Sequence, residues 1–188
     1  MKSAIKIIFL AIAYLALFII GASSGLIHPM CYAYIGAVLP LISALIYLQA
    51  STIIRSFGVA AILNGFILIM GLATGEADTF FTIGIVLLTA FAEIIRYCCK
   101  YDTLKGVRWS FIPFAYSFFA YTAHWWTDTE GSLAAAVEEM PTGYDQLMKP
   151  VIENTPMMIF VLLLTIPVSI FAMRLAERIL KNRAAELR

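Results

Sequence analysis

The sequence is poor in charged residues and in cysteine, and both shortages limit what the chain can be. Asp, Glu, Lys and Arg make up only 13% of the 188 residues, whereas 62% are apolar. This apolar surface exceeds what one water-soluble core of this size would bury, so a soluble globular domain is excluded. The three cysteines, Cys31, Cys98 and Cys99, are too few for a disulfide-stapled secreted domain. The composition indicates a membrane protein.

Motifs for catalysis and nucleotide binding are also missing. The sequence has no His-Glu-x-x-His, no Gly-x-Ser-x-Gly and no Gly-rich loop ending in Gly-Lys-Ser/Thr. We therefore expect no enzymatic activity, and ATP hydrolysis that drives its function would come from partner subunits. The formal net charge of +1 gives no reason to expect nucleic-acid binding.

Six apolar runs are present, close to the roughly 17–25 residues that cross a hydrocarbon layer. The first run is also compatible with a signal peptide, but with Ala4 and Ile5 it approaches the length of a span, and further runs follow it. We predict an all-α integral membrane protein, a single domain of six transmembrane helices over residues 1–188. The six runs are Ile7–Ile20, Tyr32–Leu48, Gly58–Thr74, Thr79–Ile95, Trp109–Trp126 and Met157–Leu175.

The positive charges gather on one side of such a bundle. An even number of spans puts both termini on the same side, and cytoplasmic termini leave only Lys149 outside. The positive-inside rule favours this orientation in the cell membrane. The twelve positive residues that then face the cytoplasm are Lys2, Lys6, Arg55, Arg96, Lys100, Lys105, Arg108, Arg174, Arg178, Lys181, Arg183 and Arg188.

The outer face is acidic in this orientation. Correct insertion explains this asymmetry, and attraction of a cationic ligand is the alternative. The long connection 127–155 lies on the same face, and its Ala-rich stretch Ser132–Met140 is predicted to form a short helical lid. The acidic residues of the face are Glu76, Asp78, Asp128, Glu130, Glu138, Glu139, Asp145 and Glu153.

The two histidines of the chain both fall on the outer face. His28 and Met30 precede the second run, and His124 stands at the outer end of the fifth run before Trp125. Two imidazoles and a thioether at one depth suit a soft metal or haem iron. The alternative is an interfacial aromatic belt with a solvated loop histidine.

Polar residues inside the runs add further candidates. Phe114, Ser117, Tyr121 and His124 recur at spacings of three, four and three, which favours either a pocket for a ring-bearing ligand or a packing stripe between helices. Asn64 is the only carboxamide in the third run, so it should face a neighbouring helix or a ligand.

Ionisable and helix-breaking residues also occur inside the runs. Glu93 stands three residues before Arg96, which favours a structural ion pair over a proton relay. Pro40, Pro113 and Pro167 each remove a backbone donor and are expected to kink their helices.

Several segments of the chain resemble the Trep_Strep family over about residues 7–180. They are Gly25-Leu-Ile-His-Pro-Met30, Gly36-Ala-Val-Leu-Pro-Leu-Ile-Ser-Ala-Leu-Ile-Tyr-Leu48, the Gly-rich third run, Ala92-Glu-Ile-Ile-Arg-Tyr97 and Tyr101-Asp-Thr-Leu-Lys-Gly106. The family is similar to substrate-binding S components of energy-coupling factor (ECF) transporters. The resemblance implies a six-helix subunit with an outward pocket that docks on a membrane scaffold subunit and two cytoplasmic ATPases.

The resemblance also implies where the scaffold would dock. Many S components contact the scaffold through an Ala-xxx-Ala pair on the first helix. This chain offers Ala11, Ala13 and Ala16, with no pair four residues apart, so Ala13 and Ala16 are the nearest candidates.

Haem is the expected cargo, because some relatives of such components are associated with haem uptake. His28 and His124 would bind the iron, Met30 would be the substitute ligand, and Tyr34, Tyr121 and Trp125 would contact the ring. Asn64 and Ser117 complete the predicted substrate site. No intrinsic cofactor is expected. The alternatives are a membrane haem protein that transfers electrons, or an S component for a vitamin-like or other small aromatic nutrient.

Overall fold

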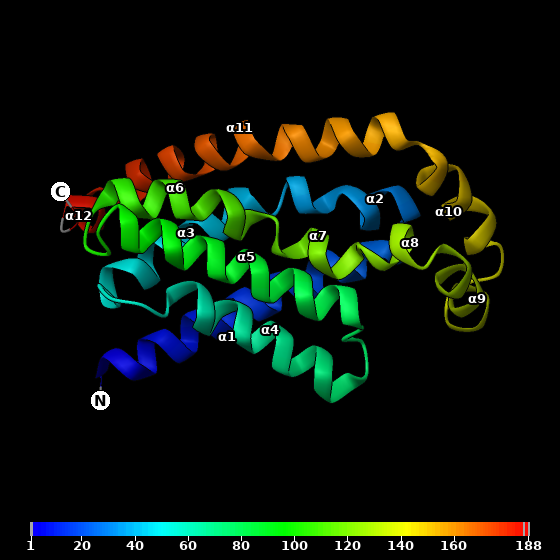
Figure 1. The fold of residues 1–188 in the computed structure, drawn as a ribbon, viewed down its shortest axis with the longest axis horizontal. Coiled ribbons are helices and arrows are strands. Elements are labelled where there is room, and N and C mark those ends of the chain that lie inside the picture. The colour runs from blue at the N-terminus through cyan, green and yellow to red at the C-terminus, as the bar shows by residue number, and fades with distance from the viewer. Residues whose placement is uncertain (1, 186, 188) are drawn as a thin grey trace.

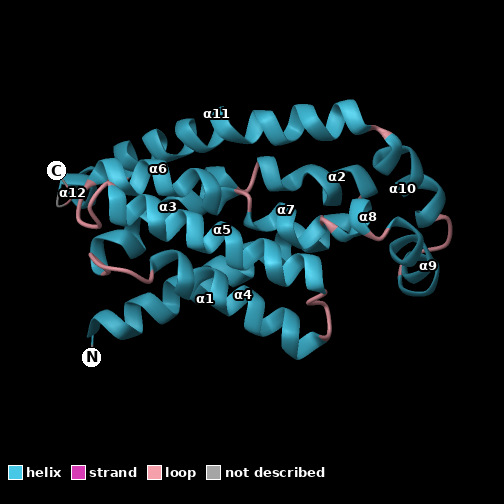
Figure 2. Cartoon of the chain, viewed as in Figure 1, coloured by secondary structure: helices cyan, strands magenta, loops and turns pink. Residues whose placement is uncertain are grey.

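The computed structural model describes residues 2–185 and 187, and all regular structure in this part is helical (Figure 2). Arg188, which the charge analysis includes, lies outside the described residues, as do the side chains of Lys2 and Arg183. The longer helices are α1 (Lys2–Ser23), α3 (Pro40–Ile53), α4 (Val59–Thr74), α5 (Thr79–Cys98), α6 (Leu104–Ala115) and α11 (Thr155–Ile179). The shorter ones are η1 (Ser24–Leu26), α2 (Pro29–Tyr34), η2 (Ile35–Ala37), α7 (Ser117–Thr122), α8 (His124–Thr127), α9 (Thr129–Glu139), α10 (Tyr144–Glu153) and α12 (Lys181–Ala185).

The described helices include three that are long and apolar enough to cross a membrane: Ser3–Leu26, α5 and α11. The bent pair Pro29–Ala37 and Pro40–Ile53 would make a fourth. α4 is apolar but has only 16 residues. The prediction of an all-α membrane protein is confirmed, whereas the count of six spans stays a prediction.

Two predicted spans are broken near prolines. The second predicted span bends by 41° where Pro40 begins α3. The fifth is divided at Tyr116, three residues after Pro113: Tyr116 N donates to Pro113 O at 3.1 Å and α6 ends there. Pro167, in contrast, lies inside α11, which continues through it.

The outer surface of the bundle is apolar, and small hydroxyl side chains lie inside it. On α11, Leu163 and Phe171 are 61% and 60% exposed, whereas Thr165 and Ser169 are fully buried. The two hydroxyls donate to backbone carbonyls one turn earlier, at 2.9 and 2.6 Å. Small residues inside and large apolar residues outside are typical of a helix bundle that faces lipid.

The two termini lie at one end of the bundle, and α9 and α10 lie at the opposite end (Figure 1). We call these the terminal end and the α9–α10 end. α9 confirms the helix predicted over Ser132–Met140, and α10 is a second helix of the same connection that the sequence analysis did not predict.

Hydrogen bonds clamp the terminal end. Leu104 N donates to Leu187 O at 2.8 Å, which joins the start of α6 to the C-terminal segment. Arg108 of α6 binds the carboxylate of Glu177 on α11 through two hydrogen bonds of 2.6 and 2.5 Å. Such a two-point pair fixes both the distance and the orientation of the helices.

Glu93 and Arg96 of α5 hold the α3–α4 connection at this end. Glu93 Oε1 accepts from Ala60 N at 2.8 Å and so caps the start of α4. The buried Arg96 donates to Ile54 O and Tyr101 O at 3.1 and 2.9 Å. No Glu93–Arg96 ion pair is present in the described part of the chain, because each side chain satisfies backbone groups instead.

Replacing Arg96 is expected to destabilise the fold. Arg96→Leu leaves the carbonyls of Ile54, Ser56 and Tyr101 without their charged donor, which should lower the free energy of unfolding by about 2–4 kcal/mol. Denaturant unfolding in mixed micelles measures this change. Arg178→Leu, at an exposed position of α11, is the matched control. Equal stability of the two variants would contradict the role of Arg96.

The native cysteines test the predicted orientation. Cys31 is exposed on α2, which packs against α10, and Cys98 is exposed at the last turn of α5. With cytoplasmic termini, a membrane-impermeant maleimide should label a variant containing only Cys31 in intact cells, and one containing only Cys98 after permeabilisation. Labelling in the reverse order would overturn the orientation.

Candidate functional site

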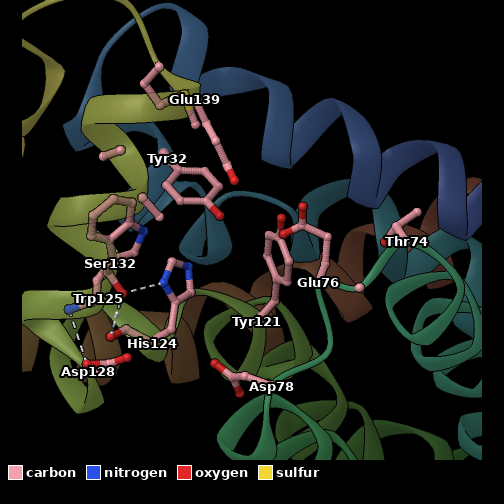
Figure 3. Close-up of a pocket in the computed structure, with 15 residues that line it drawn as sticks. Tyr32, Thr74, Glu76, Asp78, Tyr121, His124, Trp125, Asp128, Ser132 and Glu139 are labelled. Atoms are coloured by element: carbon pink, nitrogen blue, oxygen red, sulfur yellow. Dashed lines mark hydrogen bonds between the residues drawn. The ribbon is translucent and has the colours of Figure 1, made fainter.

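A pocket of about 460 Å³ lies at the α9–α10 end (Figure 3). α2, the α4–α5 connection, α7, α8 and α9 all contribute to its wall. Its volume is within the range of small-molecule sites, about 300–1,000 Å³. The chemistry-bearing side chains of the wall are Tyr32, Glu76, Asp78, Tyr121, His124, Trp125, Asp128, Ser132 and Glu139.

Aromatic rings in edge-to-face contact form one wall of the pocket. The ring of Tyr32 stands nearly perpendicular to those of Tyr121 and Trp125, with both centroid distances at 6.1 Å. Tyr121 is backed by Phe81 and Phe18, at 5.6 and 5.3 Å. This geometry is favourable for aromatic quadrupoles, so the rings hold one another in place.

His124 and Ser132 join α8 to α9 beside these rings. The Ser132 hydroxyl oxygen lies 3.1 Å from His124 O and 2.8 Å from His124 Nδ1. The hydroxyl has one hydrogen, so it donates either to His124 O, with Nδ1–H as the second donor, or to Nδ1 itself. In both cases the contact joins the start of α8 to α9 and fixes the imidazole in the pocket wall.

Two of the four carboxylates in the pocket wall, Asp78 and Asp128, cap the N-termini of helices. Asp78 Oδ1 accepts from Phe81 N at 2.6 Å at the start of α5, and Asp128 Oδ1 accepts from Gly131 N at 3.2 Å at the start of α9. Both are side-chain caps, which satisfy donors that the first helical turn leaves free. Their negative charges nevertheless remain in the pocket wall.

Glu76 and Glu139 have no such structural role. Neither side chain makes a hydrogen bond or an ion pair within the described residues, and both line the same pocket as Tyr121 and Tyr32 (Figure 3). Gly75 ends α4 with a φ of 83°, a left-handed conformation that favours glycine, and so turns the chain at Glu76. These two charges are available to a ligand.

Two buried donors near the pocket have no hydrogen-bond partner in the described structure. They are the indole N–H of Trp125, which lines the pocket, and the hydroxyl of Tyr144 on α10. Burial raises the pKa of Tyr144 above its ordinary value, so this hydroxyl stays protonated. Buried donors are normally paired, so the Trp125 N–H calls for an acceptor in the pocket.

The structure brings three of the predicted site residues into this pocket: Tyr121, His124 and Trp125. His28 and Met30 do not line it. Both are exposed at the start of α2, where His28 Nδ1 accepts from Met30 N at 3.1 Å and caps the helix before Pro29. The two imidazoles of the predicted iron site are therefore not both in the wall of this pocket.

The remaining predicted site residues hold helices together. Tyr34 donates to Val151 O at 3.2 Å and so ties α2 to α10. Asn64 donates to Thr89 Oγ1 at 2.9 Å, which links α4 to α5, as expected of a carboxamide that faces a neighbouring helix. The buried Ser117 donates to Phe114 O at 2.7 Å, next to the break after α6.

The donors in the pocket do not form a metal-binding cluster. Among the described residues, no group of three or more His, Cys, Asp or Glu side chains is arranged to hold a metal ion. Sequence reasoning did not single out Tyr32, Glu76 and Glu139, although the two glutamates belong to the acidic face that it identified. These three residues come from α2, the α4–α5 connection and α9, so only the tertiary fold brings them into one pocket.

A comparison with protein families covers nearly the whole chain. A model described as hypothetical bacterial integral membrane protein (Trep_Strep) matches residues 1–183. No curated protein and no solved structure matches the chain. The family match includes the apolar helices and all elements of the pocket.

A pair of tyrosine variants tests how α10 is held over the bundle. Tyr34→Phe removes the bond to Val151 O and should lower the free energy of unfolding by about 1 kcal/mol. Tyr144→Phe removes an unpartnered buried hydroxyl, so stability should stay equal or rise. Denaturant unfolding measures both. A larger loss for Tyr144→Phe than for Tyr34→Phe would contradict the assigned contacts.

Proposed function

We propose that this chain, which belongs to the Trep_Strep family of bacterial integral membrane proteins, is the substrate-binding S component of an ECF-type importer. The observation that carries the proposal is the pocket of about 460 Å³, which lies at the end of the bundle opposite to the termini. With cytoplasmic termini, this pocket would face the cell exterior. The chain would capture a scarce nutrient there, and partner ATPases would drive its uptake.

The construction of the pocket supports capture followed by closure. α9 supplies much of one wall, and it connects to α10 through Gly143, whose φ is 85°. α10 is fixed to the bundle, because Tyr34 and Trp126 donate to its backbone and the side chains of Met148 and Val151 are buried in the core. α9 buries only the small side chains of Ser132 and Ala136 and is tethered by the contact of Ser132 with His124. α9 is therefore the helix that can open and close over a ligand while α10 and the bundle keep their packing.

The surface of α1 supports docking on a membrane scaffold. Phe9, Ile12 and Ile20 are 70%, 51% and 65% exposed, and with the exposed Ala16 they follow one face of the helix. The half-buried Ala13 lies beside this face. A small residue among large apolar ones permits close approach of another helix. Ala16 is therefore the proposed centre of the contact, with Ala13 at its edge.

A small aromatic nutrient fits the pocket better than haem does. Haem carries two carboxylates, whereas four carboxylates and no Lys or Arg line the described wall. Of the two expected iron ligands, only His124 lines the pocket. The electron-transfer alternative likewise needs paired imidazoles. We therefore propose the vitamin-like nutrient as the cargo in preference to haem.

Co-purification tests the transport function. The tagged chain, extracted from the membranes of its host, should bring with it a membrane scaffold subunit and two ATPases. The Ala16→Trp variant should co-purify with much less scaffold subunit and ATPase, because the bulky ring holds the scaffold helix away from α1. Ala73→Trp, at an exposed alanine of α4, is the matched control and should retain them. A wild-type chain that purifies without any ATPase would refute the function.

A further inference from the structure

The wall of the pocket selects the charge of its ligand. Glu76, Asp78, Asp128 and Glu139 contribute carboxylates, and within the described residues no Lys or Arg lines the pocket to balance them. The charges of Glu76 and Glu139 are not engaged by any described donor. A wall of one sign attracts a ligand of the opposite sign and repels one of its own.

The rings of the wall suit the same kind of ligand. Tyr32, Tyr121 and Trp125 pack edge to face in the wall. Tyr32 and Trp125 are 6% and 3% exposed, so the half-buried Tyr121 is the ring most open to the pocket. Electron-rich ring faces attract an ammonium group that lies within about 6 Å of the ring centre. They also stack on flat ligands. Carboxylates and aromatic rings in the wall of one pocket thus provide two attractions that both favour a positively charged, ring-bearing ligand.

The Trp125 indole N–H adds an independent requirement. It is buried in the pocket wall without a partner in the described structure, and such a donor is costly unless a ligand satisfies it. A bare metal ion offers no acceptor, and the described residues contain no metal-binding cluster. An organic molecule with a nitrogen or oxygen acceptor meets this requirement.

We propose that the substrate captured in this pocket is a ring-bearing organic cation, a primary or quaternary ammonium compound with an additional hydrogen-bond acceptor for Trp125. The inference rests on the proposed function and adds the class of substrate. Glu76 and Glu139 neutralise the cationic centre, the half-buried Tyr121 contacts it through its ring, and the Trp125 N–H binds the acceptor.

Three probes of the same shape test the charge requirement. Phenethylammonium, 2-phenylethanol and phenylacetate share one ring and one chain length and carry positive, no and negative charge. Calorimetric titration of the full-length protein in detergent should show phenethylammonium binding at least about tenfold more tightly than 2-phenylethanol. Phenylacetate should show no binding. Added salt should reduce the preference, since exposed charges are screened.

Carboxamide variants locate the source of the preference. Glu76→Gln combined with Glu139→Gln should reduce the preference for phenethylammonium over 2-phenylethanol to about threefold or less, while 2-phenylethanol binding stays unchanged. The matched control is Glu130→Gln combined with Glu153→Gln. These two glutamates are exposed on α9 and α10 and do not line the pocket, so the preference should persist.

A ring nitrogen tests the role of Trp125. 2-(2-Aminoethyl)pyridine adds an acceptor to phenethylammonium and should bind more tightly by about threefold to tenfold. Trp125→Phe keeps a ring in the wall but removes the donor, so this gain should disappear. A gain of the same size in both proteins would overturn the assignment of Trp125.

The possible results separate the substrate class from the transport function. Equal binding of the three phenyl probes, tightest binding of phenylacetate, or no binding of phenethylammonium would overturn the cationic substrate. Tight binding of haemin by the wild-type protein, abolished in the Tyr121→Ala variant, would also overturn the cationic substrate. Each of these leaves the ATPase co-purification intact. Loss of co-purification with a preserved cation preference would instead refute the importer and retain the cationic ligand.

Discussion

The edge-to-face contact of Tyr32 with Tyr121 and Trp125 is the interaction on which the α9–α10 end depends. It joins α2 to α7 and α8, three short helices with little packing surface of their own. Each such ring pair contributes about 0.5–1.5 kcal/mol beyond the area it buries. The same rings form the wall of the pocket, so the stability of this end and the shape of the site have one origin.

The second and fifth apolar segments are interrupted where they approach the pocket end of the bundle. Irregular backbone at membrane depth is tolerated only where protein covers it or a cavity borders it. The chain bends before Pro40, and α6 ends before Tyr116, whose hydroxyl donates to Leu162 O of α11 at 2.6 Å. The two broken segments thus supply three short helices, α2, α7 and α8, which carry Tyr32, Tyr121 and Trp125.

The local patterns of the sequence predicted much of the fold. Long apolar runs predicted α1, α5 and α11 because length and hydropathy act along one segment. The Ala-rich stretch predicted α9 for the same reason. The prolines inside the runs predicted kinks, and the chain does bend by 41° at Pro40. The pattern of apolar residues does not change along the fifth run, so its division at Tyr116 into α6 and α7 was not predicted.

The site was predictable only where its residues share one segment. The spacing of Tyr121 and His124 placed both at the pocket, but Phe114 and Ser117 of the same stripe are buried in the core below the break. Glu76, Glu139 and Tyr32 come from three separate segments, so their approach depends on tertiary packing. His28 precedes a proline at the first helical position, a capping signal that fits its place outside the pocket.

The ion pair between Arg108 and Glu177 lies at the terminal end of the bundle. It fastens α6 to α11 near the termini through two hydrogen bonds. At the other end α10 is held by hydrogen bonds from Tyr34 and Trp126 and by buried apolar side chains, whereas α9 buries only Ser132 and Ala136. Because the ion pair joins α6 and α11 by two bonds, it sets the angle at which the apolar faces of these two helices are turned outward at the terminal end.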